Sequence, residues 1–200
     1  MAHPSSRSGR TDEELALEAR AGSRPSFDEL ALRYRRRLFV YLRPRLASDQ
    51  DAEDMVQETF LKLYRNIGSY DPAYRFSTWL YTSANRLAIS SFRKKQASGV
   101  QVEPAGISAR SPTKADGEEA LAGLWEAAWT LGGNQFRVLW LRYGEGMTVA
   151  EIAASLSKSR LAVRLLLHRA RTNLMKRFRR APAPAAAATG RGTAGETTIG

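Results

Sequence analysis

Apolar residues in two parts of the chain recur at the spacing of an α-helix. Between residues 11 and 96 they follow one another at intervals of three or four positions, as in the series Phe27, Leu30, Tyr34, Leu38 and Tyr41. This period predicts helices that bury one face. Four are expected in this part, at about 11–22, 26–43, 51–66 and 75–95. No run alternates with period two for long enough to indicate a strand.

Residues 118–180 show the same helical period. Helices are expected here at about 118–131, 134–143, 148–156 and 160–179. Thr148 and Glu151 form a capping-box pattern, as Thr11 and Glu14 do at the start of the first helix. The last two helices are joined by a turn of three or four residues, which is the geometry of a helix-turn-helix. The sequence therefore predicts an all-α fold of two small helical domains.

Three segments lack this period. Residues 97–117 contain prolines, glycines and several serines, and we expect a flexible linker there. Residues 1–10 and the low-complexity tail 181–200 cannot build a core, and disorder is expected in both. The domains are therefore placed at 11–96 and 118–180.

The distribution of charge narrows the function. The 200 residues carry 31 Lys+Arg against 20 Asp+Glu, a formal net charge of +11. Residues 1–96 hold 17 basic and 12 acidic residues, and residues 118–180 hold 11 and 5. Both domains are thus basic, and such an excess favours a polyanionic partner.

The last predicted helix is basic without any acid. Nine Lys/Arg lie between Lys158 and Arg180, and no acid occurs from Ile152 to Gly195. A solvated charged face is the alternative interpretation, but such a face normally mixes both signs. As the second helix of a helix-turn-helix, this one favours contact with phosphates and with the groove of DNA.

An acidic run stands out in the otherwise basic first domain. Its members are Asp49, Asp51, Glu53, Asp54 and Glu58. Acids in a first helical turn favour the positive end of the helix dipole, which explains part of the run. Glu58 lies beyond that turn, and Asp54, Gln57 and Glu58 share a polar face. This face indicates a protein partner with a basic surface.

Residues 70–95 interleave aromatic and basic side chains. About half of the aromatics are expected in the core, with Phe76 the clearest case. The others, especially in the turn from Tyr70 to Tyr74, can stack on unpaired bases while the cations hold phosphates. Composition alone leaves both interpretations open.

No enzymatic site is indicated. The chain has no cysteine and only two histidines, His3 and His168, which argues against a thiolate or histidine metal site and a catalytic triad. No phosphate-binding glycine loop or GxSxG motif is present. We expect neither a cofactor nor a metal. No stretch has the length of a signal peptide core or a membrane span, so a cytoplasmic protein without membrane insertion is expected.

Several motifs together resemble the bacterial sigma-70 family, in particular its extracytoplasmic-function (ECF) group. DAEDMVQETFL at 51–61, FSTWLY at 76–81 and LAISSFRKK at 87–95 are similar to region 2 of that family. GMTVAEIA at 146–153 and HRAR at 168–171 are similar to its region 4. The motifs cover roughly residues 11–96 and 118–178, in the family's order, with its linker between them.

The resemblance implies a sigma factor, which is not a catalyst but gives RNA polymerase its promoter recognition. The implied partners are core RNA polymerase, through the clamp helices of its largest subunit and its flap, and promoter DNA. An anti-sigma factor is a further candidate partner that leaves no trace in the sequence. The residues implied to bind polymerase are Asp51, Asp54, Gln57, Glu58 and Phe60.

The resemblance also implies two sets of DNA-binding residues. Those expected at the melted −10 strand are Tyr70, Tyr74, Arg75, Trp79, Asn85, Arg86, Arg93 and Lys94. Those expected in the major groove at the −35 element are Arg160, Arg164, Leu165, Leu166, His168, Arg169 and Arg171.

The chain departs from the family pattern at five places, two of which are Ser90 in place of a common aspartate and Gly132-Gly133 in place of a proline pair. Asn85-Arg86 stands in the reverse of the usual order, and Ser157 occupies the position of the usual turn glycine. Leu165-Leu166 replaces a polar pair; leucines cannot hydrogen-bond base edges, although they can touch thymine methyl groups. Two alternatives therefore remain: a sigma-like regulator that binds polymerase but reads promoters weakly or differently, and a helix-turn-helix regulator that acts without polymerase.

Overall fold

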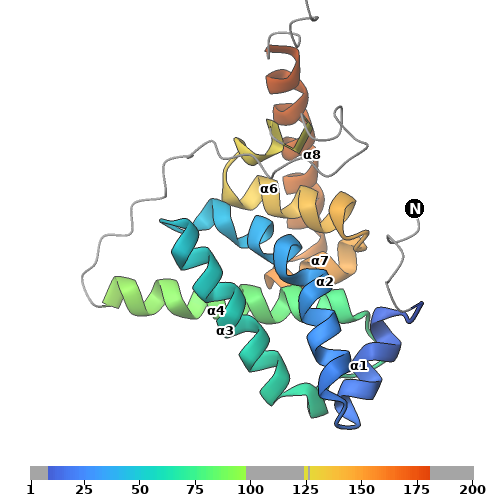
Figure 1. Ribbon diagram of the computed structural model, residues 1–200. Coiled ribbons are helices and arrows are strands. Elements are labelled where there is room, and N and C mark those ends of the chain that lie inside the picture. The colour runs from blue at the N-terminus through green and yellow to red at the C-terminus, as the bar shows by residue number, and fades with distance from the viewer. Residues whose placement is uncertain (1–8, 98–123, 126, 181–200) are drawn as a thin grey trace, which may run out of the picture.

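The computed structural model describes residues 9–97, 124–125 and 127–180, and this part of the chain consists of helices and turns without a strand. The predicted all-α fold is confirmed. Figure 1 shows the helices in two groups, one from each predicted domain. The predicted N-terminal segment up to residue 8, the linker at 98–117, the start of the second domain and the tail from 181 lie outside the described residues.

The first group contains four α-helices and two short 3-10 turns. They are α1 (Asp12–Arg20), α2 (Arg24–Leu42), η1 (Arg43–Arg45), α3 (Asp49–Arg65), η2 (Ile67–Ser69) and α4 (Phe76–Ala97). The predicted capping box opens α1, since Glu14 N donates to Thr11 Oγ1 and Thr11 N donates to Glu14 Oε2. Pro25 lies in the first turn of α2, where its missing N–H costs nothing.

The helical period correctly identifies the core of this group. Phe27, Leu30, Tyr34, Leu38 and Tyr41 are all buried along α2, and Phe76, Leu80, Ala84 and Leu87 are buried along α4. Aromatic rings fill the space where the two helices meet. Their contacts join Tyr34 to Phe76, Tyr70 to Phe76 and Tyr70 to Trp79.

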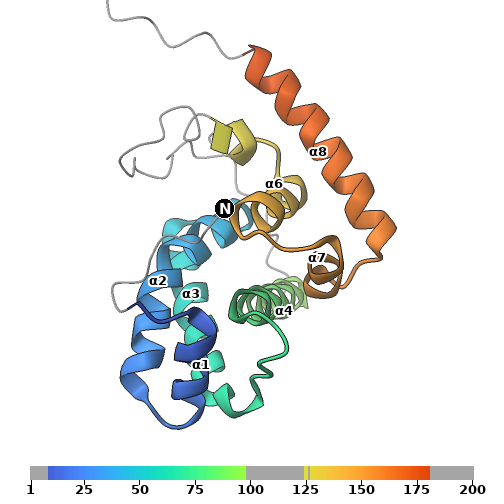
Figure 2. The same ribbon diagram turned by 90° about the vertical axis from the view of Figure 1, so that its right-hand side faces the viewer.

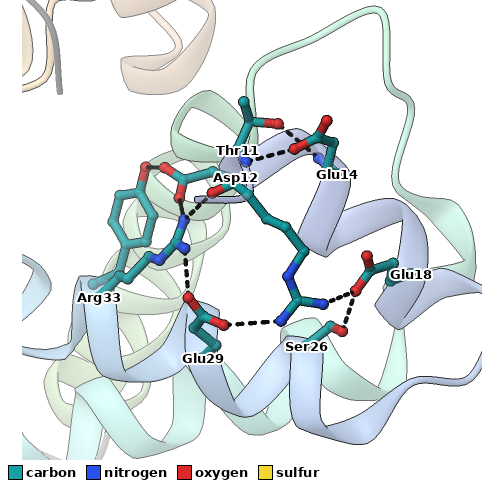
Figure 3. A network of polar contacts seen from close by, with 9 residues as sticks. Thr11, Asp12, Glu14, Glu18, Ser26, Glu29 and Arg33 are labelled. Carbon is teal, nitrogen blue, oxygen red and sulfur yellow. Dashed lines mark hydrogen bonds and ion pairs between the residues drawn. The ribbon is translucent and has the colours of Figure 1, made fainter. Parts of the chain in front are cut away.

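A polar network fastens α1 to α2 (Figure 3). Arg33 donates to Asp12 Oδ1 at 2.7 Å and to Glu29 Oε1 at 2.5 Å, and the Tyr34 hydroxyl donates to Asp12 Oδ2 at 2.5 Å. Arg10 bridges Glu18 and Glu29 in the same way. Burial and the neighbouring Asp12 carboxylate raise the pKa of Tyr34, so its hydroxyl stays a donor. The network fixes the packing of the two helices.

The second group contains α6 (Gly133–Leu139), a π-helical turn η3 (Trp140–Gly144), α7 (Val149–Leu156) and α8 (Arg160–Arg180). Thr148 and Glu151 form the predicted capping box of α7. Ser159 Oγ accepts from Ala162 N in the first turn of α8. Val163, Leu167, Ala170 and Leu174 form the buried face of α8, as the period predicts.

The two groups pack directly against each other. α7 lies between α4 and α8, while α8 extends away from the first group (Figures 1 and 2). We refer to this packing of the second group on α2 and α4 as the closed arrangement. None of the described helices is long and apolar enough to span a membrane.

The turn between α7 and α8 is held in a strained backbone conformation. Ser157 has φ +52° and ψ +46°, the left-handed region that glycine adopts without a steric cost. Ser157 N and Lys158 N still donate to the last carbonyls of α7, which is the usual bonding of a helix end. The helix-turn-helix geometry is thus kept although the usual glycine is replaced.

Ser157→Gly should therefore raise the free energy of unfolding by about 1 kcal/mol, because it removes the side-chain clash at positive φ. Chemical denaturation followed by circular dichroism measures this. Ser157→Ala is the matched control, since it keeps a Cβ and should not stabilise the protein. Equal stability of the glycine variant and the wild type would contradict the assignment of strain to this turn.

Candidate nucleic-acid and partner-binding surfaces

The exposed face of α8 carries the predicted −35 residues with one exception. Arg160, Arg164, Leu165, His168, Arg169 and Arg171 are exposed. The exception is Leu166, which is half-buried and packs against the core. Arg171 also stacks over the ring of Tyr143, with its Cζ 5.7 Å from the ring centroid. Among the described residues that follow Glu151 there is no acid, so α8 adds no negative charge to this surface.

Leu161 is an exposed residue of α8 that the sequence interpretation missed. Its side chain is 65% exposed, and Leu165, one turn further along, is 50% exposed. The sequence pattern does indicate this exposure. Leu161 lies outside the series Val163, Leu167, Ala170 and Leu174, which forms the buried face of the helix. Two large apolar side chains therefore lie side by side in the middle of a basic surface.

The predicted polymerase-binding residues divide into two kinds. Asp51 belongs to the start of α3, where its backbone N–H donates to Ser48 Oγ and its carboxylate accepts from the same hydroxyl. Asp54, Gln57 and Glu58 are exposed, and Asp54 accepts from Gln50 at 2.9 Å. Phe60 is half-buried and contacts Phe27 edge-on. The acidic face therefore consists of Asp54 and Glu58.

A groove of about 730 Å³ runs between α2 and α3 beside this acidic face. Its lining is mainly apolar and includes Phe27, Leu32, Val56, Phe60, Leu61 and Tyr64, together with Gln57. Leu32 is 76% exposed and Leu61 55%. Both leucines were missed from sequence, although each falls outside the buried series of its helix. Arg24, Asp28 and Arg35 also line the groove, so charges of both signs border its apolar centre. An exposed apolar groove with a polar border is typical of a protein-binding surface.

The predicted −10 residues are only partly accessible. Tyr74, Arg86, Arg93 and Lys94 are exposed, while Arg75 and Trp79 are half-buried. Tyr70 is 1% exposed, its hydroxyl donates to Tyr74 O, and burial raises its pKa to about 12. The expectation that Tyr70 lies ready to stack on bases is therefore corrected, because the ring is part of the core.

Asn85 is also inaccessible, for a different reason. Its side chain is buried beneath the second group, where Asn85 Nδ2 donates to Ser155 O at 2.9 Å and Oδ1 accepts from Arg137. The closed arrangement thus occupies both hydrogen-bonding atoms of the amide. A residue implied to capture a base is instead used in a contact between the two groups.

Glu145 is the centre of the polar contacts between the groups. Its side chain is fully buried, accepts from Arg37 Nη2 at 2.8 Å and accepts from the Tyr81 hydroxyl at 2.6 Å. Burial raises the pKa of Glu145, and the Arg37 guanidinium and the Tyr81 hydroxyl lower it in part. Burial also raises the pKa of Tyr81 well above its ordinary value. A carboxylate from the second group therefore accepts hydrogen bonds from two residues of the first.

Two arginines share one neutral acceptor nearby. Arg45 and Arg137 both point at Asn85 Oδ1, and Arg137 Nε also donates to the Tyr41 hydroxyl at 3.1 Å. Burial, and then repulsion by Arg137, lower the pKa of Arg45 to about 10. Gly133 leaves room for Arg45, since a Cβ there would lie 2.9 Å from its Cγ. Two like charges thus face each other across the contact.

The capping box of α7 also takes part in the contact. Glu151 accepts from Thr148 N at 2.7 Å and from the Thr78 hydroxyl of α4 at 3.0 Å. Burial acts to raise the pKa of Glu151, but these hydrogen bonds outweigh it and the pKa is lowered. The described residues hold no group of three or more His, Cys, Asp or Glu that could bind a metal ion.

The chain matches two family descriptions that lie in the two groups. Sigma-70 region 2 matches residues 30–98, and Sigma-70, region 4 matches residues 130–174. The first match contains α3 and α4 and most of α2. The second contains α6, α7 and most of α8.

Curated relatives and solved structures agree with these matches. The ECF RNA polymerase sigma factor BldN of Streptomyces coelicolor is 32% identical over 164 residues, which cover 78% of this chain and 62% of BldN. The ECF RNA polymerase sigma factor SigW of Bacillus subtilis is 29% identical over 175 residues, covering 81% of this chain and 94% of SigW. The chain thus spans less than two thirds of BldN and nearly all of SigW.

The fold is similar to chains of two solved structures. The sigma factor RpoE, solved with the anti-sigma factor NepR from Bartonella quintana, has a TM-score of 0.60 and 21% identity over 75% of this chain and 92% of that chain. CnrH, solved with the cytosolic domain of CnrY, has a TM-score of 0.56 and 23% identity over 82% of this chain and 95% of that chain. At these identities the likeness concerns the fold alone.

Arg37→Met should make the closed arrangement depend more strongly on pH than it does in the wild type. The substitution removes the cation that lowers the pKa of Glu145, so this pKa rises further above its ordinary value of 4.5. A carboxyl with a raised pKa stabilises the closed arrangement fully below about pH 4.5, and this contribution is lost as the pH rises through the raised pKa. The variant should therefore open at lower pH than the wild type as the pH rises, and close again on acidification.

Fluorescence energy transfer measures this opening, because dyes can be attached to cysteines introduced at Glu53 and Thr172 in a chain that has none of its own. Arg65→Met, which removes an exposed arginine of α3, is the control and should leave the transfer efficiency unchanged. A transfer efficiency in Arg37→Met that equals the wild type at every pH would rule out Glu145 as the centre of closure.

Proposed function

Because this chain belongs to the sigma-70 family, in its ECF group, we propose that it binds core RNA polymerase and directs it to promoters by contacts at the −10 and −35 elements. In this role the chain catalyses no reaction itself. It supplies sequence recognition and strand opening to the polymerase. One observation carries the proposal: an exposed apolar groove with two exposed acids beside it and an acid-free basic helix occur in the same chain, on separate surfaces.

Polymerase binding is assigned to the α2–α3 groove and the acids beside it. Asp54 and Glu58 are exposed and complement a basic partner, while Leu32 and Leu61 offer apolar area that would leave water on binding. Charged groups at the rim set orientation and association rate, and the apolar centre supplies affinity. The acids without the groove would give a weaker and less specific site.

DNA binding is assigned to both groups. On α4, the exposed residues Arg86, Arg93 and Lys94 can hold the phosphates of the −10 strand. Asn85 reaches a base only after α7 leaves α4, so we infer that the two groups separate when the promoter is opened. α8 needs no such change, because its basic face is exposed in the closed arrangement.

Asp54→Arg combined with Glu58→Arg should abolish binding to core polymerase, because it puts two cations where a basic partner surface docks. Co-purification with core polymerase measures this, and in vitro initiation on a promoter panel measures the loss of function. Asp71→Arg, an exposed charge reversal in the turn before α4, is the control and should bind normally. A double variant that retains wild-type affinity would show that the acidic face is not the docking surface.

Arg164→Ala with Arg169→Ala should reduce initiation that depends on the −35 element. The slope of log K against log salt is negative, and each lost phosphate contact makes it shallower by about 0.9. Its magnitude should therefore decrease by about 2 for the pair. Footprint titrations of the holoenzyme at several salt concentrations measure the slope. Lys62→Ala with Arg65→Ala, which removes two exposed cations of α3, is the control. An unchanged slope in the α8 variant would remove these arginines from the −35 contact.

A further inference from the structure

Two leucines occupy the centre of the surface that α8 presents to solvent. At 100° per residue, Val163, Leu167, Ala170 and Leu174 define the buried side of the helix. Leu161 and Leu165 lie opposite that side, one turn apart. They are 65% and 50% exposed. They also lie in the first two turns of the helix, the part that meets base edges in a helix-turn-helix.

Cations surround the leucine pair. Arg164 lies on one side of it and Arg169 on the other, and His168 follows along the same face. All three are exposed, and no acid follows Glu151 in the described residues. A protein partner for an apolar surface of this kind would have to be strongly acidic. The charge pattern fits the two phosphate backbones that border the major groove of DNA.

Leucine side chains restrict what can be recognised within that groove. They can neither donate nor accept a hydrogen bond, so guanine, cytosine and adenine edges gain nothing from them. In the major groove the C5-methyl group of thymine is the apolar feature of a base pair. The burial of one such group against leucine contributes about 0.8 kcal/mol, which is about a fourfold change in affinity.

We propose that Leu161 and Leu165 form an apolar contact surface that selects thymine methyl groups in the −35 element, while the flanking arginines bind the phosphates. This inference rests on the proposed sigma function and adds a specificity to it. Leu166 has no part in this contact, because it is half-buried and packed against the core. The structure thus assigns one member of the sequence pair Leu165-Leu166 to recognition and replaces the other by Leu161.

The test uses the holoenzyme formed by the full chain with core polymerase. Promoters are first selected by transcription from templates with a randomised −35 segment and a fixed −10 segment. Each −35 thymine of a selected promoter is then replaced by deoxyuridine, which lacks only the methyl group. We expect about fourfold weaker binding for each contacted thymine, and no change for replacements outside the −35 element.

Leu161→Ala with Leu165→Ala should bind the thymine promoter less tightly and no longer distinguish thymine from uracil. Met175→Ala is the matched control, since Met175 is an exposed apolar residue further along α8 and its loss should preserve the fourfold difference. Equal binding of the wild-type holoenzyme to the thymine template and the deoxyuridine template overturns the inference. This holds even if the leucine variant binds less tightly, because the leucines would then contact a protein and not a thymine methyl group. Failure to transcribe any template overturns the proposed sigma function itself, which is a separate outcome.

Discussion

The position of the second helical group depends on one buried carboxylate. Glu145 leaves the π-helical turn after α6 and is enclosed by Arg37 and Tyr81 from the first group. A buried carboxylate without partners would cost several kcal/mol, so a placement that buries Glu145 also has to bring Arg37 and Tyr81 to it. Around it lie the contacts of Asn85 with Ser155 O and of Thr78 with Glu151, which require the same placement. The closed arrangement therefore has to keep Arg37 and Tyr81 on Glu145, which restricts how the two groups can pack.

The helices and most of the core could be predicted from the sequence, because a periodic signal reports which face of a helix is buried. Both capping boxes were identified because such a box depends only on two residues three positions apart. The contacts between the groups could not be predicted, since nothing in the spacing of Arg37, Tyr81 and Glu145 indicates that they meet. Tyr70 was misplaced because an aromatic ring in a turn has the same composition whether it stacks on a base or fills a core. Leu161 and Leu61 were overlooked although each lies outside the buried series of its helix.

The closed arrangement affects the two proposed DNA-binding surfaces unequally. The basic face of α8 is exposed, whereas Asn85 on α4 is covered by α7 and Arg137. A chain of this shape can contact duplex DNA before it can accept an unpaired base. The groove between α2 and α3 lies on the first group alone and is open as well. Under the proposed function, polymerase docking and duplex contact are thus compatible with closure, and strand capture is the step that requires separation.

The convergence of Arg45 and Arg137 on a neutral amide has a consequence for the energetics of this separation. Burial of two guanidinium groups without a carboxylate between them makes closure less favourable than its other hydrogen bonds alone would make it. The repulsion offsets part of the stabilisation by the other contacts between the groups. It therefore reduces the free-energy difference between the closed arrangement and the separated groups. Each 1.4 kcal/mol changes a two-state ratio tenfold, so a narrow gap makes the population sensitive to modest binding energies. The arginine pair therefore opposes closure, so that a modest binding energy is enough to separate the two groups.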